Sequence, residues 1–401
     1  MRSLKFLTVV IVTLLSASSL LLLSAVLVCC TPMDQMESID YRMIRYETAD
    51  FSSLAKFEHR DLNLADYENI LFFVDKSVIF SVAAIEYPTV DPFGNPIQAS
   101  GLVYHPINKK SKGVINMLPF AHLDEHGPSD KMYTVEGLPI LQGYTVILPD
   151  LLGFGSSSAT KVPFLLAENT GRVAYDMRRA AAQYLWDQFR YQLPAETVIA
   201  GYSLGGSAAL ATQKYYETYH PNTVKIKEVY AGGGAYDLPA AFSAFAQTGF
   251  SDFAAIPHTI FAFNHYYHLD IDFSQIFVAV PLLDSDSWYH GTYRTDKEEQ
   301  LGTNIHGYMH PDFFKPFDQQ NQEFKKLHPY LVLNSVSEGW KPKAPIYLFH
   351  ATGDTYVPHE CAEVMLKKLR RAGGNLSLTT YPGNHGVIAA LFILRILLHF
   401  S

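Results

Sequence analysis

A serine flanked by glycines is the residue of this sequence best suited to nucleophilic chemistry. The segment 201–205, Gly-Tyr-Ser-Leu-Gly, has the pattern G-x-S-x-G, which exposes a serine hydroxyl where a strand turns sharply into a helix. Gly201 and Gly205 suit such a turn, because the strand and the helix pass too close together to leave room for a Cβ atom. We therefore predict that Ser203 is a nucleophile.

Two residues far along the chain could activate this serine. A serine hydroxyl becomes a good nucleophile only beside a base, and the base needs a carboxylate that fixes its tautomer. Asp354 follows the apolar run 346–349, and His385 lies in a loop after the last strand that the sequence predicts. Functional side chains gather at the carboxyl ends of parallel strands, and the chain order Ser203, Asp354, His385 therefore indicates a catalytic triad.

The oxyanion that forms when a serine attacks a carbonyl group needs backbone N–H donors. One donor is expected from Leu204, directly after the nucleophile, and the second from the loop that follows the strand predicted at 113–118. Pro119 begins this loop and has no N–H group. We therefore predict that Phe120 or Ala121 supplies the second donor of the oxyanion hole.

Strands and helices alternate along most of the chain. Short runs rich in β-branched and aromatic residues predict strands, and apolar residues at helical spacing predict helices. Strands are expected at 78–85, 99–105, 113–118, 145–148, 196–200, 226–231, 345–350 and 377–381, and helices at 169–192, 205–219, 361–371 and the C-terminus. This order predicts the α/β fold class, with a mostly parallel central sheet and helices on both faces.

The stretch 239–340 interrupts this alternation. A structureless loop of such length is rare in a compact domain, so we expect an inserted helical cap between two parts of the core, 67–238 and 341–401. The cap could line the substrate site with apolar side chains or could be additional core, and we favour the first interpretation. Its aromatic residues are Phe242, Phe245, Phe250, Phe253, Phe261, Phe263, Tyr266, Tyr267, Phe273, Phe277, Trp288 and Tyr289.

From about residue 114 to the C-terminus the sequence resembles the α/β-hydrolase superfamily. The resemblance is carried by the segments 143–155 and 231–238, the turn around Ser203, and the loops that hold Asp354 and His385. More narrowly, the chain is similar to the secretory-lipase-like group of capped, exported ester hydrolases. The resemblance implies an α/β-hydrolase fold with an inserted cap. In the loop after the strand predicted at 113–118, where related enzymes often place His-Gly, this chain has instead Pro-Phe-Ala-His at 119–122.

Composition and charge exclude some other classes of protein. The chain has 401 residues, of which 48% are hydrophobic and 17% are charged, and this is typical of a globular protein with a large core. It carries 31 Lys and Arg residues against 39 Asp and Glu residues, a net charge of -8, with no basic run outside the N-terminus. A nucleic acid is therefore not an expected partner.

The first thirty residues have the character of a targeting segment. Arg2 and Lys5 precede the uncharged stretch 6–30, so we expect 1–30 to be a signal peptide or a membrane anchor. Cys30 also resembles the acylated residue of a lipoprotein, although a cysteine at the preceding position is unusual. These features predict an exported protein, either secreted or attached to a membrane. Residues 31–66 are polar and mixed, and are interpreted as an N-terminal extension.

Clusters of histidine and aspartate raise the question of a metal site. Solvated side chains are the default interpretation of both clusters, so neither is preferred as a metal site. The segment 153–155 lacks the third glycine of a dinucleotide-binding motif. We therefore expect no metal and no cofactor. The clusters are His122, Asp124 and His126 in the first, and His265, His268, Asp270 and Asp272 in the second.

Together these features predict an exported serine esterase or lipase that acts on a small-molecule or lipid ester through an acyl-enzyme. Two alternatives remain open at this point. A peptidase or another acyl-transfer enzyme would use the same triad, and a catalytically silent surface module could bind hydrophobic ligands through the cap. The sequence does not indicate the acyl chain length, the leaving group or the oligomeric state.

Overall fold

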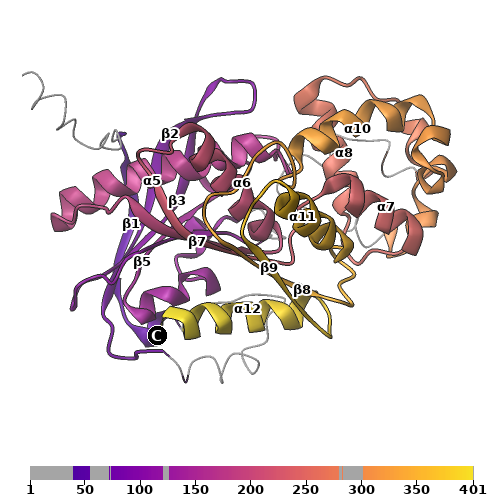
Figure 1. Cartoon of the computed structure of the whole chain (residues 1–401). Helices are drawn as coiled ribbons and strands as arrows, with labels where there is room; N and C mark the ends of the chain where they lie inside the picture. The colour runs from indigo at the N-terminus through magenta and orange to yellow at the C-terminus, as the bar shows by residue number, and fades with distance from the viewer. Residues whose placement is uncertain are drawn as a thin grey trace, which may run out of the picture. The chain divides into compact units, whose positions relative to one another are not determined.

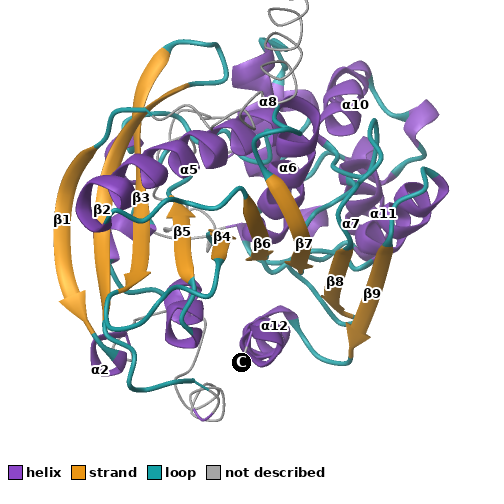
Figure 2. Cartoon of the chain, turned by 60° about the vertical axis from the view of Figure 1, so that its left-hand side comes forward, coloured by secondary structure: helices purple, strands orange, loops and turns teal. Residues whose placement is uncertain are grey.

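A nine-stranded sheet forms the centre of the fold (Figures 1 and 2). The computed structural model describes residues 39–54, 72, 74–120, 126–279, 282 and 301–400, which all belong to the unit Ser38–Ser401. The strand order in the sheet is β1-β2-β3-β5-β4-β6-β7-β8-β9. The strands are β1 (Arg42–Ala49), β2 (Phe80–Val90), β3 (Pro96–Pro106), β4 (Val114–Leu118), β5 (Thr145–Pro149), β6 (Glu196–Tyr202), β7 (Lys225–Gly232), β8 (Ile346–Ala351) and β9 (Leu376–Tyr381).

The sheet has a parallel part and an antiparallel edge. Strands β5, β4, β6, β7, β8 and β9 are parallel to their neighbours in that order, whereas β1, β2 and β3 pair antiparallel and join the rest where β3 meets β5. Every residue of β4 and β5 is buried, as expected for parallel strands that are covered on both faces. The prediction of a mostly parallel sheet is therefore confirmed.

Helices cover both faces of this sheet. The main ones are α5 (Ala167–Phe189), α6 (Leu204–Tyr219), α11 (Glu360–Arg371) and α12 (His385–Phe400). Buried side chains of α5 pack with β2, β3 and β5 in one apolar cluster, and those of α12 pack with η2 (Val135–Gln142) and the sheet in another. Figure 2 shows α5 and α6 on one side of the sheet and α12 on the opposite side.

The segment between β7 and β8 is helical in its described parts. It contains α7 (Leu238–Thr248), α8 (Ala255–Tyr267), α10 (Gln322–Asn334) and the short turns η4 (Phe273–Gln275), η7 (Ile305–Gly307), η8 (Pro311–Phe314) and η9 (Phe317–Gln319). We refer to these described residues of 239–340 as the cap. Figure 1 shows its helices together at the end of the sheet nearest α11. Trp288 and Tyr289 lie outside the described residues.

The N-terminal part of the fold differs from the prediction. Residues 31–66 were expected to form an extension, but β1 lies within this range and pairs with β2 along the edge of the sheet. Most residues of β1 are exposed, and its apolar residues do not alternate with polar ones, so its sequence carries little strand signal. The short helix α2 (Phe51–Leu54) follows it. The predicted targeting segment 1–30, with Cys30, lies outside the described residues.

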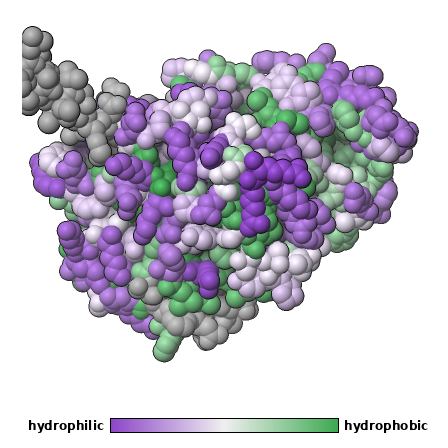
Figure 3. All heavy atoms as spheres, in the orientation of Figure 1, coloured by the Kyte–Doolittle hydropathy of each residue, from purple (hydrophilic) through white to green (hydrophobic). Residues whose placement is uncertain are grey.

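The described surface has the mixture of residues common to folded proteins. Figure 3 shows hydrophilic residues over much of the face seen in Figure 1, with hydrophobic residues in smaller patches between them. Within the described ranges, no helix combines the length and the apolar character that a membrane span needs. Cys361 is a buried free thiol in α11.

Candidate active site

Ser203 occupies a strained turn between a strand and a helix. β6 ends at Tyr202 and α6 begins at Leu204, so Ser203 is the single residue between them. Its backbone has φ 58° and ψ -124°, a conformation that residues with a side chain rarely adopt. The Ser203 N–H donates to the carbonyl of Gly232 at the end of β7 (2.8 Å), which helps to hold the turn.

The glycines of the motif are required by close backbone contacts. A Cβ atom on Gly201 would lie 2.1 Å from the carbonyl oxygen of Gly205, across the turn. A Cβ atom on Gly205 would lie 2.5 Å from the Leu118 carbonyl and 2.7 Å from that of Pro119, which belong to the end of β4 and the loop after it. Larger residues at these positions would push α6 away from the sheet.

The structure brings the three predicted side chains together. The Ser203 hydroxyl donates to Nε2 of His385 (2.8 Å), and Nδ1–H of His385 donates to Oδ2 of Asp354 (2.7 Å). Ser203 follows β6, Asp354 follows β8, and His385 begins α12 shortly after β9, so all three lie at the carboxyl edge of the parallel strands. The arrangement allows a proton to pass from the hydroxyl to the imidazole, with a carboxylate behind it.

Asp354 is buried and accepts hydrogen bonds on both oxygens. Its side chain is inaccessible to solvent, and Oδ1 accepts the backbone N–H groups of Tyr356 (3.0 Å) and Val357 (2.9 Å). Burial by itself raises the pKa of Asp354, but hydrogen bonds from His350 and His385 outweigh it and hold the pKa well below its usual range. Asp354 is therefore a carboxylate at neutral pH.

His350 is a member of the site that the sequence prediction missed. It lies within β8, its side chain is fully buried, and its Nε2 lies 3.0 Å from the Val357 carbonyl and 3.4 Å from Oδ2 of Asp354. Nε2–H therefore points at the Val357 carbonyl and the Asp354 carboxylate. The signal that could have found it is a histidine at the end of a strand, four residues before the acid.

Tyr202 holds the backbone of the histidine. Its hydroxyl donates to the carbonyl of His385 (2.6 Å), and the ring centroids of the two residues lie 5.0 Å apart. Tyr202 is the second residue of the G-x-S-x-G motif, at the end of β6, and only 1% of it is exposed. The residue before Ser203 therefore also fixes the position of His385.

Leu204 and Phe120, the two predicted oxyanion donors that the structure describes, have different surroundings. Leu204 is the first residue of α6, where backbone N–H groups have no intrahelical acceptor and the helix dipole is positive. The N–H group of Phe120 instead donates to Oε1 of the buried Glu136 in η2 (2.9 Å). In this structure the Phe120 N–H is thus directed at Glu136, and its role as an oxyanion donor stays a prediction. Ala121, the other candidate, lies outside the described residues.

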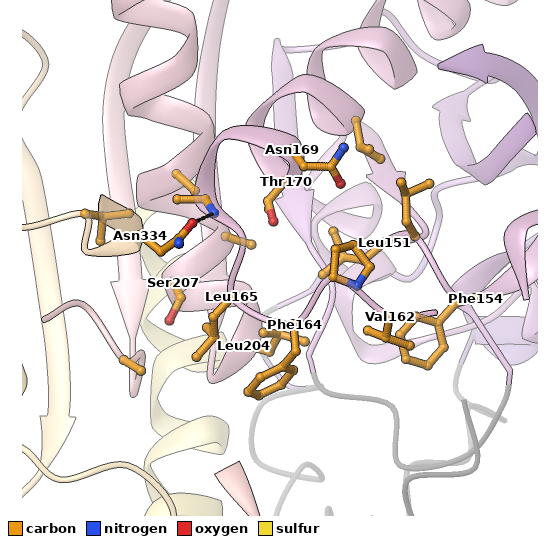
Figure 4. Close-up of a pocket in the computed structure, with 18 residues that line it drawn as sticks. Leu151, Phe154, Val162, Phe164, Leu165, Asn169, Thr170, Leu204, Ser207 and Asn334 are labelled. Carbon is orange, nitrogen blue, oxygen red and sulfur yellow. Dashed lines mark hydrogen bonds between the residues drawn. The ribbon is translucent and has the colours of Figure 1, made fainter. Parts of the chain in front are cut away.

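A small apolar pocket adjoins the nucleophile turn. Figure 4 shows Leu204, Phe164, Leu165 and Ser207 around it, with contributions from the loop after β5 and from α5. The cavity has a volume of about 30 Å³. Because Leu204 lies in its wall, the cavity is directly beside the turn that carries Ser203. Its other lining residues include Leu151, Leu152, Phe154, Val162, Pro163, Val173, Ala208, Ala211 and Val336.

The histidine clusters of the sequence do not form a metal centre where the structure describes them. Among the described residues, no group of three or more His, Cys, Asp or Glu side chains is arranged to hold a metal ion. His265 and His268 both pack against the ring of Phe93, with centroid distances of 5.5 Å and 5.2 Å. His122 and Asp124 lie outside the described residues.

Solved structures share this fold at low sequence identity. A ligand-bound form of LipA, a rice cell wall degrading esterase from Xanthomonas oryzae, is 20% identical with a TM-score of 0.71, covering 91% of this chain and 96% of that one. Candida antarctica lipase A in its closed state is 16% identical with a TM-score of 0.60, covering 91% of this chain and 82% of that one. A search of curated proteins found no match.

The family of the chain follows from its sequence as well as from its fold. The model of the α/β-hydrolase family matches residues 126–389, which is more than half of the chain and includes Ser203, Asp354 and His385. The order of these residues and the parallel sheet with helices on both faces agree with that match. The chain therefore belongs to the α/β-hydrolase family.

Proposed function

We propose that the protein is a serine hydrolase that cleaves carboxylic esters through an acyl-enzyme. The observation that carries this proposal is the continuous chain of hydrogen bonds from Ser203 through His385 to the buried Asp354, with distances of 2.8 Å and 2.7 Å. A base within hydrogen-bond reach of the nucleophile, itself oriented by a carboxylate, is the arrangement that activates a hydroxyl group.

The proposed reaction has two halves. Oγ of Ser203 forms a bond to the ester carbonyl carbon while its proton moves to Nε2 of His385. The tetrahedral oxyanion is held by the N–H of Leu204, with Ala121 as the proposed second donor. The bond to the alcohol oxygen then breaks as His385 returns the proton to it, which leaves an acyl-enzyme. Water repeats these steps, releases the acid and restores Ser203.

The apolar pocket wall at Leu204, next to Ser203 in sequence, motivates an apolar group on the substrate. The adjoining pocket is lined mainly by aliphatic and aromatic side chains, including Leu204 and Phe164. An esterase and a lipase are among the solved structures that share the fold, and these names motivate the choice of an ester. The resemblance to secretory-lipase-like enzymes supports the same choice and stays a prediction.

Labelling by a fluorophosphonate probe together with hydrolysis of p-nitrophenyl esters tests this proposal. We expect wild-type protein to be labelled at Ser203, and Ser203→Ala to lose labelling and to lower kcat by at least about 10⁴-fold. Ser158→Ala, which changes an exposed serine, is the matched control and should behave as wild type. Ester hydrolysis that survives in Ser203→Ala would overturn the assignment.

The same experiment separates the alternatives that the sequence left open. A peptidase would also be labelled, but would cleave aminoacyl substrates in preference to p-nitrophenyl esters. A silent binding module for hydrophobic ligands would show neither labelling nor hydrolysis. Comparing esters of increasing acyl length would then define the substrate range of an active enzyme.

We further propose that residues 1–30 direct export and that the mature protein associates with a membrane through its N-terminal segment. The proposal is supported by the uncharged stretch 6–30 after Arg2 and Lys5, with Cys30 as the proposed acylation site. Mass spectrometry of the N-terminal peptide from a membrane fraction tests it. We expect a lipid-modified Cys30 that Cys30→Ser abolishes, whereas an unmodified N-terminus in the soluble fraction would contradict lipid anchoring.

A further inference from the structure

A column of stacked aromatic rings connects the catalytic histidine to the cap. The rings of His385 and Tyr356 are nearly parallel, at 10°, with centroids 5.0 Å apart. The ring of Tyr356 is nearly parallel to that of Phe253, at 8°, with centroids 6.3 Å apart. Phe253 in turn stacks on His258 of α8, at 5.6 Å. Phe253 and His258 belong to the cap, whereas Tyr356 belongs to the loop of the triad acid.

Hydrogen bonds fix this loop against the cap at the same place. The Thr355 hydroxyl donates to Oδ2 of Asp252 (2.5 Å), and the Asp252 N–H donates to the Thr355 carbonyl (3.1 Å). On the other side, the Tyr356 N–H donates to Oδ1 of Asp354 (3.0 Å). Tyr356 is therefore positioned from two directions, by the triad acid and by the cap.

The imidazole of His385 packs against two tyrosine rings. Tyr356 stacks in parallel on it, and the ring of Tyr202 approaches it at 47° with a centroid distance of 5.0 Å. During the proposed reaction this imidazole becomes an imidazolium. A cation close to the face of an aromatic ring is stabilised by the ring's quadrupole, and more strongly where water is excluded. Only 9% of His385 is exposed to solvent.

We propose that Tyr356 is a positioning residue for the catalytic base: its ring holds the imidazole of His385 in line with Ser203 and stabilises the imidazolium, and the cap loop around Asp252 and Phe253 keeps Tyr356 in place. This inference rests on the proposed function, and it gives the cap a role in the chemistry besides lining the substrate site. Tyr356 itself transfers no proton. Its effect is on the geometry and the charge of His385.

Two substitutions of Tyr356 test the role of its ring. Tyr356→Phe keeps the ring, and we expect it to retain most of the wild-type kcat. Tyr356→Leu keeps an apolar side chain without a ring, and we expect kcat for a p-nitrophenyl ester to fall by about 10-fold, with KM changed little. Fluorophosphonate labelling gives the concentration of active sites, so that a misfolded fraction does not contribute to the comparison.

The pH dependence separates stacking from a purely structural effect. Without the ring, the charged imidazole loses a favourable contact, so the acid limb of kcat/KM in Tyr356→Leu should move to lower pH by about half a unit to one unit. Loosened packing alone would admit water, which favours the charged form and moves the limb the opposite way. An acid limb that stays in place or moves upward would overturn the proposal.

The role of the cap loop is tested at Asp252, which contacts the loop of Tyr356 but is not one of the stacked rings. Asp252→Ala removes the acceptor of the Thr355 hydroxyl, and we expect kcat to fall about threefold with the acid limb displaced in the same direction as in Tyr356→Leu. Asp318→Ala, which changes an exposed acid elsewhere in the cap, is the matched control. Equal kcat in Asp252→Ala and Asp318→Ala would show that the cap loop does not keep Tyr356 in place.

An NMR titration distinguishes failure of this inference from failure of the proposed function. The imidazole of His385 can be followed in histidine-labelled protein and assigned by its loss in His385→Gln, whether or not the protein hydrolyses esters. Its titration midpoint should be lower in Tyr356→Leu than in wild type or Tyr356→Phe. Equal midpoints in all three proteins would overturn the inference, even if Ser203 proves to be the nucleophile.

Discussion

Asp354 shows how single residues set the chemistry of this site. The carboxylate is buried, yet two backbone N–H groups, His385 and His350 surround it and keep its pKa low. A fixed anion behind the imidazole favours the tautomer in which Nε2 can accept the proton of Ser203. His350 is a side-chain donor outside the Ser203–His385 pair, so it can be changed without removing either member of that pair.

Substitution of His350 tests this arrangement. His350→Leu keeps much of the side-chain volume but removes the donor near Asp354, so the pKa of that carboxyl should rise and kcat/KM for a p-nitrophenyl ester should fall by about 10-fold. His350→Gln can place an N–H near the position of Nε2 and should recover part of the loss. Steady-state kinetics normalised to labelled active sites measure both. Wild-type kcat/KM in His350→Leu would contradict a role for this donor.

The strand and the helix on either side of Ser203 are packed without space for an additional side chain. α6 approaches the carboxyl ends of β4 and β6 so closely that a Cβ on Gly205 would collide with two backbone carbonyls. Backbone atoms cannot move aside as a flexible side chain can. We therefore expect Gly205→Ala to destabilise the fold by about 1–3 kcal/mol and to lower the fraction of protein that a fluorophosphonate labels. Chemical denaturation and active-site labelling measure the two effects.

Gly307 provides the control for that substitution. A Cβ at this position would meet nothing within 4 Å, and its φ angle is not in the left-handed region. Gly307→Ala should therefore leave both the free energy of unfolding and the labelled fraction close to wild type. If Gly205→Ala were equally harmless, the close contact of α6 with β4 would not be what places Ser203.

Elements with a local pattern could be predicted from the sequence, and contacts between distant segments could not. The strand predicted at 196–200 and the helix predicted at 205–219 agree with β6 and α6 to within two residues, since apolar runs, glycines and helical spacing are local signals. β1 was not predicted because its residues are mostly exposed. The hydrogen bond from the Phe120 N–H to Glu136 was not predicted because it forms only in the folded chain.

The same distinction between local patterns and contacts of distant segments applies to the residues of the site. Ser203, Asp354 and His385 each follow a predicted strand, and strand ends of a parallel sheet lie at one edge, so the sequence could predict that they meet. Tyr356 was not predicted as a neighbour of His385, because their stacking depends on the path of two loops. Packing of the cap against one of these loops also has no local signal. Such contacts are visible only in three dimensions.

Across the whole molecule, buried polar groups connect elements that are distant in sequence. Arg178 of α5 is 1% exposed and donates to the side chain of Asn116 in β4 (2.9 Å), which joins a helix to the middle of the sheet. Asp150, directly after β5, is fully buried and accepts the hydroxyls of Ser100 and Ser129. These groups fix the register of helices and strands at the cost of desolvation.

Ionisation of Asp150 should make the protein less stable as the pH rises. Burial raises its pKa to about 6, against an ordinary value of 3.8, even though hydrogen bonds from Ser100 and Ser129 oppose the shift. The folded state thus holds a proton that the unfolded chain has already released between these two values. The contribution of Asp150 is greatest below pH 4 and is lost as the pH rises through about 6, a change on the order of 2–3 kcal/mol.

Asp150→Asn isolates this contribution from that of the other carboxyl groups. The amide is close in shape to the acid and does not ionise, so the free energy of unfolding of the wild type should fall relative to the variant between pH 4 and pH 6.5, and the difference should then level off. Denaturant titrations at a series of pH values measure it. Asp318→Asn, at an exposed position, should run parallel to wild type. A wild-type curve parallel to that of Asp150→Asn would mean that hydrogen bonds from Ser100 and Ser129 compensate fully for burial, and that this carboxylate is held as an anion like that of Asp354.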